Sequence, residues 1–189
     1  KWMISETAGN VEGSIAPGGG MLINIDNPAL KYTISHTSGL AGVGDVTDDG
    51  TMVVGECTSK PAYWLTAVQE WTILPLPEGY LWGRLNTVTP DGKFAAGMAG
   101  KEDEWSFYPI FYDLSTKTLI ELPGLPNRDM TNQDQGQNAI TAISPDGRSV
   151  LGNISQSYIL PTALCSYVYD RQTATYDFIG FTEPATATG

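Results

Sequence analysis

Histidine and cysteine are scarce in this sequence, and their scarcity limits the chemistry that the chain can carry. Its 189 residues include one histidine, His36, and two cysteines, Cys57 and Cys165. A zinc site of the histidine and cysteine type needs about four such ligands, so we predict no metal site and no cofactor. His36 lies among serines and threonines, and the G-x-S-x-G pattern of many hydrolases is missing. We therefore predict no catalytic residue.

Basic residues and long apolar runs are also in short supply. Lys and Arg number 10 against 21 Asp and Glu, which gives a net charge of −11. An acidic surface repels a phosphate backbone, so we predict no nucleic-acid binding. The charge favours solubility, and it would also attract basic partners or cations. No apolar stretch has the roughly 20 residues that span a bilayer, so we predict no membrane insertion.

Turn residues, in contrast, are plentiful, and a turn that ends in glycine recurs along the chain. The best copies are Val46–Gly55, Val88–Gly97 and Ile143–Gly152, and a looser copy is Ile15–Asn24. Pro or Asp occupies the turn, and Gly takes the position that often needs a positive φ. The apolar residues after the Gly predict a buried second strand, so each copy indicates a hairpin.

A second pair of strands follows three of these hairpins at a constant spacing. In each case an aromatic strand is followed, nine residues after its end, by an apolar residue in another short strand. The pairs of positions are Leu65 and Leu74, Asp113 and Leu122, and Asp170 and Ile179. Each unit is therefore expected to hold four short strands, A to D, with tight A–B and C–D turns.

The spacing of the repeats predicts the fold class. The turn glycines stand at 19, 50, 92 and 147, so the periods are 31, 42 and 55 residues, and two of them bracket the length of a four-stranded propeller blade. We predict an all-β chain of β-propeller blades, each with four antiparallel strands. About three full blades and a partial one are expected, which makes the chain an incomplete propeller or a fragment of a larger one.

The predicted boundaries place all blades in one propeller domain. Residues 43–77, 84–126 and 138–181 are the full blades, 1–42 is a partial blade, and 182–189 is a linker tail. Lys1–Ser5 is interpreted either as an outer strand left over from another blade or as the strand that closes the ring. Propellers typically have four to eight blades, so we expect the exposed blade faces to meet further blades or a second copy of the chain.

The Pro-Asp-Gly turns, followed by small and apolar residues, resemble the repeats of the TolB/WD40-like β-propeller superfamily and the related extracellular repeats of bacterial envelope proteins. The resemblance covers residues 43–181 well and 11–42 poorly. The Gly-His and Trp-Asp signatures of true WD40 repeats are missing, which favours the bacterial branch. The resemblance implies a fold, and a secreted, periplasmic or outer cell-surface location in a bacterium.

The placement of the loops gives the predicted binding surface. Residues 99–106, 127–137 and 155–162 are long and join strand B to C or strand D to A, so we expect them on one face, with the tight turns on the other. Long loops on a rigid scaffold are typical recognition elements. The predicted ligand-binding residues on this face are Asp103, Glu104, Trp105, Arg128 and Tyr158.

The residue types explain this choice. A Trp beside carboxylates offers a stacking platform for a sugar or a peptide side chain, and the aromatic neighbours Phe107 and Tyr108 extend it. Arg128 and Tyr158 would complete the surface. The alternative for Trp105 and Tyr158 is packing between blades. Four other aromatic residues lie in strands and are assigned to the core: Trp64, Trp71, Tyr112 and Tyr169.

Two further patterns are interpreted as structural. The repeated turn residues Asp48-Asp49, Asp91 and Asp146 have the composition of a calcium ring. An Asp at that turn position normally accepts hydrogen bonds from the local backbone, however, and the spacing of an EF-hand is missing. The cysteines fall in different repeats and at different strand positions, so we expect two separate buried thiols.

The predicted function is a non-enzymatic binding or scaffolding domain that recognises a protein or a glycan through the long-loop face. One alternative is an enzyme-associated propeller, such as the N-terminal propeller of a peptidase related to prolyl oligopeptidase, or the scaffold of a glycosidase or lyase. The other alternative is a structural spacer, in which case Trp105 and Tyr158 would have no ligand role.

Overall fold

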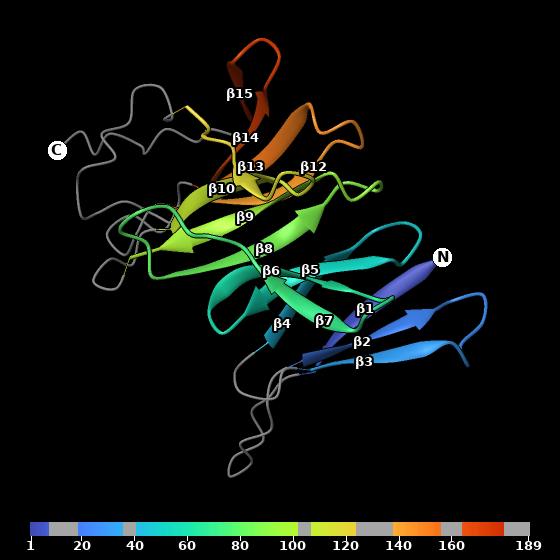
Figure 1. Ribbon diagram of the computed structural model, residues 1–189. Helices are drawn as coiled ribbons and strands as arrows, with labels where there is room; N and C mark the ends of the chain where they lie inside the picture. Colours follow the sequence, from blue (N-terminus) through green and yellow to red (C-terminus); the bar gives the residue numbers. More distant parts are fainter. Residues whose placement is uncertain (8–18, 36–40, 102–106, 124–137, 156–163, 180–189) are drawn as a thin grey trace, which may run out of the picture.

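The computed structural model describes residues 1–7, 19–35, 41–101, 107–123, 138–155 and 164–179. Over these ranges the chain forms strands and turns that assemble into four antiparallel sheets (Figure 1). None of the described segments is a helix with the length and apolar character needed to cross a membrane.

The sheets follow the chain order. The first holds β1 (Trp2–Thr7), β2 (Gly19–Asn24) and β3 (Lys31–Ser35). The second holds β4 (Ala41–Val46), β5 (Met52–Cys57), β6 (Lys60–Leu65) and β7 (Glu70–Ile73). The third holds β8 (Trp82–Val88), β9 (Phe94–Gly100), β10 (Phe107–Asp113) and β11 (Thr118–Leu119). The fourth holds β12 (Asn138–Ile143), β13 (Ser149–Ser155), β14 (Leu164–Asp170) and β15 (Thr175–Ile179).

The repeated turns form as the sequence predicts. Gly50, Gly92 and Gly147 have φ values of 71°, 71° and 70°, in the left-handed region that glycine enters without strain. They close the hairpins β4–β5, β8–β9 and β12–β13, which are the A–B pairs of three four-stranded sheets. Each of these sheets is a meander with its strands in sequence order.

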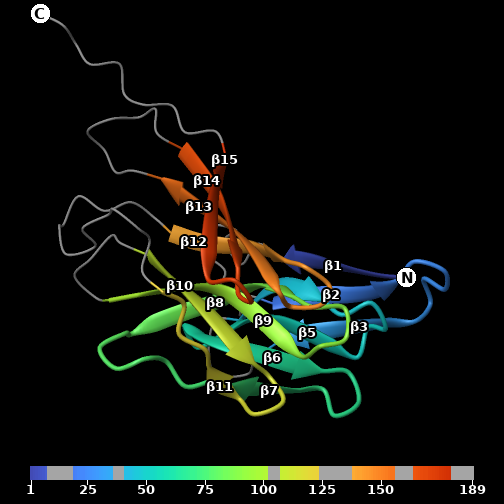
Figure 2. The ribbon, with the colours of Figure 1, turned by 90° about the horizontal axis from the view of Figure 1, so that it is seen from above.

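The sheets pack face to face as the blades of a propeller. Strands β8 and β12, the first strands of the third and fourth blades, each lie against the preceding sheet, and β4 lies against β1 and β2. Figures 1 and 2 show β8–β11 between the sheets β4–β7 and β12–β15. The predicted all-β propeller class, with three four-stranded blades and a smaller one, is confirmed.

Hydrogen bonds between the first strands of successive blades add to this packing. Arg84 Nη2 donates to the Val43 carbonyl at 2.9 Å, and Asn86 Nδ2 donates to the Ile140 carbonyl at 3.0 Å. Asp45 Oδ2 accepts from the Val88 N–H at 3.0 Å. These bonds cross two neighbouring blade interfaces, so they fix the order and the spacing of the blades.

Three apolar clusters fill the spaces between the sheets. The cluster between the second and third blades includes Tyr63, Leu85 and Tyr112, and the cluster between the third and fourth includes Phe111 and Tyr167. The cluster between the first and second blades is built on Leu22, Ile34, Val43, Val53 and Trp64. The predicted core positions Trp64, Tyr112 and Tyr169 are buried, whereas Trp71, on the outer strand β7, is partly buried.

The first sheet corrects two predictions. The strand β1 pairs with β2 along its whole length, so it is neither a leftover outer strand nor the closing strand of the last blade. Gly19 is the first residue of β2, where it pairs with Thr7 and Ser35, and it does not form a turn. A Cβ on Gly19 would stand 2.2 Å from the Ile34 carbonyl oxygen, so this glycine serves the close approach of two strands.

The turn between β2 and β3 shows which blade positions, A to D, the three strands of the first sheet occupy. Asn24 Oδ1 accepts hydrogen bonds from the N–H groups of Asp26 and Asn27, as Asp113 Oδ1 does from Ser115 and Thr116 in the C–D turn of the third blade. The tight turn between β2 and β3 is therefore a C–D turn. The first sheet consists of strands B, C and D.

Candidate functional site

The five predicted ligand-binding residues, Asp103, Glu104, Trp105, Arg128 and Tyr158, lie outside the described residues and stay predictions. His36 also lies outside them. Cys57 is a free, buried cysteine at the end of β5, and burial raises the pKa of its thiol. Cys165 lies in β14, where its backbone pairs with Ile154.

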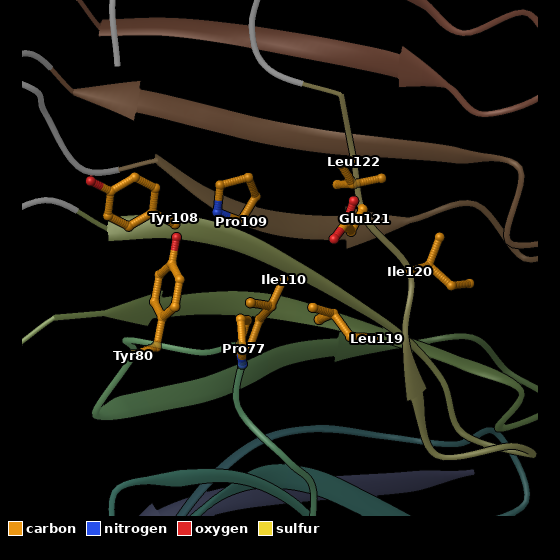
Figure 3. A pocket seen from close by; sticks show the side chains of 9 residues that line it. All are labelled: Pro77, Tyr80, Tyr108, Pro109, Ile110, Leu119, Ile120, Glu121 and Leu122. Atoms are coloured by element: carbon orange, nitrogen blue, oxygen red, sulfur yellow. The ribbon is translucent and has the colours of Figure 1, made fainter. Parts of the chain in front are cut away.

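The described residues form a cavity whose lining includes Tyr108, two residues after the predicted loop in the sequence. It has a volume of about 270 Å³. Its walls come from the connection between β7 and β8, from the start of β10, and from the end of β11 and the residues after it. The lining residues are Pro77, Tyr80, Tyr108, Pro109, Ile110, Leu119, Ile120, Glu121 and Leu122 (Figure 3).

Two tyrosines on one side of this cavity contact each other and a lysine outside its lining. The rings of Tyr80 and Tyr108 meet edge to face, with centroids 5.3 Å apart and an interplanar angle of 90°. Lys101 Nζ lies 5.6 Å from the Tyr80 centroid and 5.4 Å from the Tyr108 centroid. Both distances are within the range of cation–π attraction. This arrangement joins the end of β9, the start of β10 and the connection between two blades.

Backbone hydrogen bonds hold that connection in place. The Leu74 N–H donates to the Pro61 carbonyl at 2.8 Å, and the Leu81 N–H donates to the Gly100 carbonyl at 3.0 Å. Between these points, the Tyr112 hydroxyl donates to the Pro75 carbonyl at 2.6 Å. Burial raises the pKa of Tyr112 to about 12, so the phenol stays a donor at neutral pH. The Tyr80 wall of the cavity is therefore anchored on both sides.

The other wall exists because the D strand of this blade is short. In the β10–β11 pair, Tyr112 pairs with Leu119 and Asp113 pairs with Thr118. Beyond them, the Ile120 N–H donates to the Phe111 carbonyl at 2.7 Å. In the fourth blade β14 and β15 pair over five positions. The early end of pairing in the third blade leaves room beside Pro109 and Ile110, where the cavity lies.

The cavity offers groups for binding. Its walls are mostly apolar or aromatic, two phenols can donate or accept hydrogen bonds, and Glu121 is its single carboxylate. Stacking faces with a few polar groups are the usual make-up of a recognition site. A glycosidase would need a pair of carboxylates across the site, and the described cavity lining holds one.

The repeated turn aspartates have the structural role that the sequence favours. Each Oδ1 accepts a hydrogen bond from a backbone N–H two residues further on, at 2.9 Å for Asp49, 3.1 Å for Asp91 and 3.0 Å for Asp146. The pKa of each carboxyl group is lowered from 3.8, and the largest cause is the backbone hydrogen bond for Asp49 and Asp91 and the Ser144 hydroxyl for Asp146.

The sequence marked part of this site and missed the rest. Lys101 and Tyr108 stand at the two ends of the loop that carries the predicted Trp105. Tyr80 and Glu121 were not predicted, because they belong to connections whose course depends on contacts with β10. The only available signal was that both connections lead from a D strand to the next blade, on the face assigned to the long loops.

Neither a protein-family model nor a curated protein matches the sequence. Solved structures do match the fold. TolB from Acinetobacter baumannii superposes with a TM-score of 0.59 at 13% identity, covering 89% of this chain and 39% of TolB. An oligogalacturonate lyase in complex with manganese gives 0.61 at 11% identity, covering 88% and 47%. A prolyl endopeptidase gives 0.57 at 12% identity, covering 88% and 26%.

These matches define a fold and leave the activity open. The chain spans less than half the length of each of the three proteins, and two of the three names are those of enzymes. The four sheets, their order and the superposition on TolB agree with the resemblance found in the Pro-Asp-Gly turns. The chain therefore has the TolB-like β-propeller fold.

Proposed function

We propose that this chain is a non-enzymatic binding domain that recognises a protein or a glycan at the long-loop face of its propeller. The observation that carries this proposal is the cavity lined by Tyr80 and Tyr108. Tyr108 in its lining comes two residues after the predicted loop at residues 102–106 in the sequence, so the proposed surface joins this loop to the cavity.

The cavity is suited to binding because its walls are held in place before a ligand arrives. Ile110 is 2% exposed, and it belongs to the core cluster between the second and third blades. The hydrogen bond from Tyr112 to Pro75 fixes the connection that carries Tyr80. A preformed site loses little conformational entropy on binding, which favours recognition by a rigid scaffold.

A secreted, periplasmic or outer cell-surface location in a bacterium is part of the proposal. Its support is the resemblance of the turns to bacterial envelope repeats and the shared fold with a bacterial TolB. The acidic composition, with 21 acidic against 10 basic residues, would favour basic partners through long-range attraction.

The test is a combined glycan and peptide array, probed with the wild-type chain and with the double variant Tyr80→Ala, Tyr108→Ala. We expect a ligand signal for the wild type that the double variant loses. The matched control is Phe178→Ala, which removes a 41% exposed aromatic ring on β15 that is not part of the cavity lining, and should leave the signal unchanged. A wild-type signal that both variants retain would rule out the cavity as the site.

The loop residues are tested on the same array. The variant Trp105→Ala, Tyr158→Ala should weaken binding if the predicted loops extend the cavity surface. Unchanged binding for this variant would restrict the site to the cavity itself and would favour the packing interpretation of Trp105 and Tyr158.

A further inference from the structure

We infer that the cavity is the anchor point of a peptide-binding edge, at which an extended basic peptide adds as a strand beside β10. This inference rests on the proposed function, because it names the ligand class of the same site. Its basis is a difference between two repeats of the fold: one blade pairs this position with its own chain, and within the described residues the next blade does not.

In the second blade, the chain that follows the D strand pairs with the outer edge of strand C. Pro61 in β6 and Pro109 in β10 are equivalent, since each lies four residues before the end of its strand, at Leu65 and Asp113. The Leu74 N–H donates to the Pro61 carbonyl at 2.8 Å, and the Leu74 side chain is 1% exposed. The chain after the D strand therefore completes the outer edge of β6.

In the third blade the described residues leave the same edge unpaired. The Phe111 carbonyl points to the outer edge, because it accepts from the Ile120 N–H. Backbone groups of alternate residues in a strand point the same way, so the Pro109 carbonyl and both backbone groups of Phe107 face this edge too. Within the described residues no donor reaches the Pro109 carbonyl. Leu122, the equivalent of Leu74, packs against the next interface.

The edge and the cavity together define the chemistry of the occupant. A backbone N–H of an added strand would reach the Pro109 carbonyl, and the Phe107 N–H and carbonyl would pair with the residue two positions away in that strand. Such strand addition gives affinity through the main chain, while a pocket for a side chain gives specificity. Because Pro109 has no N–H, the edge offers its hydrogen bonds at few positions.

The size of the cavity favours a side chain over a whole small ligand. Its volume of about 270 Å³ lies below the roughly 300–1,000 Å³ that is typical of small-molecule pockets. An apolar side chain from the added strand would lie between Ile110, Leu119 and the Tyr80 ring, which face the cavity in Figure 3. The edge then holds the rest of the peptide.

Charge selects a basic peptide. Glu121 is exposed and is the one carboxylate in the cavity lining. The whole chain carries a net charge of −11, so a Lys or Arg in the peptide gains from the long-range field and, near Glu121, from this carboxylate. Lys101, over the Tyr80 and Tyr108 rings, directs the basic residue to the Glu121 side of the cavity (Figure 3). An acidic peptide would be repelled by the same field.

The experiment begins with selection from a random linear-peptide display library on the wild-type chain. Selected peptides should carry a Lys or Arg near an apolar residue. Their affinity is then measured by fluorescence polarisation for the wild type, for Leu119→Trp, which fills the cavity, and for Glu121→Gln. The Phe178→Ala variant is the control and should bind like the wild type.

The expected changes separate strand addition from simple side-chain binding. Leu119→Trp should weaken binding at least tenfold, and Glu121→Gln should weaken it about two- to fivefold. The effect of Glu121→Gln should be smaller at high salt than at low salt. Methylating one peptide backbone nitrogen at a time should weaken binding about tenfold at the position that donates to Pro109, and little at its immediate neighbours. This alternation is a signature of a strand that pairs with an edge.

The outcomes distinguish the inference from the proposed function. A flat response to backbone methylation would overturn strand addition, and equal binding of acidic and basic peptides would overturn the basic occupant. Either result would leave a binding site at the cavity. Selection of no peptide, together with a glycan signal that Tyr80→Ala, Tyr108→Ala removes, would also overturn strand addition and would assign the site to glycans. Failure of both ligand classes on the wild-type chain would remove the proposed function as well.

Discussion

Replacing Tyr112 by Phe removes one hydroxyl group and leaves the buried ring in place. The Tyr112 hydroxyl donates to the Pro75 carbonyl at 2.6 Å, and the side chain is fully buried. We expect Tyr112→Phe to lower the free energy of unfolding without creating an apolar cavity. It should also loosen the connection that carries the Tyr80 wall of the binding site.

The magnitude follows from the loss of a single part-buried hydrogen bond. Such a bond contributes roughly 0.5–1.5 kcal/mol net, and Pro75 is exposed, so water can take the place of the lost donor at its carbonyl. We therefore expect a loss of about 0.5–1.5 kcal/mol. For a chain of this length each kcal/mol lowers the Tm by about 2–4 °C, so the Tm should fall by about 1–6 °C.

The assay is urea unfolding followed by fluorescence of the five tryptophans, with Tyr63→Phe as the matched control. Tyr63 is buried in the same core cluster, and no hydrogen bond of its hydroxyl is found within the described residues. Its loss should be below about 0.5 kcal/mol, the usual size for a change that breaks no specific interaction. Equal losses for the two variants would refute the reasoning.

The stability of the chain at alkaline pH gives a second test of the role of Tyr112. The pKa of Tyr112 is raised to about 12 from 10.0 because burial disfavours the phenolate. The folded state therefore holds its proton more tightly than the unfolded state, and this contribution is complete below pH 10.0 and is lost as the pH rises towards about 12. The difference in stability between the wild type and Tyr112→Phe should shrink over that window.

Further predictions concern the turns and the acid limit of stability. Gly92→Ala should lower the free energy of unfolding by about 1–2 kcal/mol, because Gly92 has a left-handed φ. Gly147→Ala should lower it by about 1–3 kcal/mol more, since the new Cβ would also lie 2.3 Å from a phenylalanine ring. Chemical denaturation of both variants measures the difference, and equal losses would contradict it. Ser59→Gly should stabilise the chain by about 0.5–1 kcal/mol, because Ser59 has a φ of 61°; an unchanged or lower Tm would show that the strain is absent. The pKa of Asp170 is lowered from 3.8 to about 2, and the largest cause is its hydrogen bond with an arginine. Its contribution to the stability of the folded state is therefore complete above pH 3.8 and is lost as the pH falls through about 2. Asp170→Asn should flatten that part of the acid-unfolding curve, and a curve parallel to the wild type would contradict this prediction.

The sequence predicted the features of the fold that depend on local conformation. The turns at Gly50, Gly92 and Gly147 were found because a positive φ after Pro-Asp or Asp-Asp is a property of a few neighbouring residues. Gly19 was misassigned because a run of glycines is equally suited to a turn and to a close approach of two strands. Only the pairing of β2 with β1 and β3 decides between them.

A better signal for the first blade was present in the sequence. Asn24, Asp113 and Asp170 all begin C–D turns and accept hydrogen bonds from the backbone two and three residues further on. Aligning Asn24 with the two aspartates, instead of Gly19 with the turn glycines, would have placed β1 as strand B. The local chemistry of the side chain was a sharper guide than glycine alone.

The cavity could not be predicted, because it arises from contacts between distant segments. Tyr80 belongs to the connection between β7 and β8, and Glu121 follows β11. Both residues line the cavity together with the start of β10, although they are far from it in the sequence. The short pairing of β11, which leaves the edge open, also has no clear sign in a sequence that contains the same apolar pattern as the other blades. The loop at residues 99–106 could be proposed because loop length is visible in the sequence.

The most direct test of the central claim is the two-dimensional ¹H–¹⁵N spectrum of the labelled chain, recorded with and without a ligand selected on the array or from the display library. The account predicts that the amide signals of Tyr80, Lys101, Ile110, Leu119 and Glu121 shift, while those of the turns at Gly50, Gly92 and Gly147 do not. Shifts confined to the tight-turn face, with the cavity signals unchanged, would contradict it.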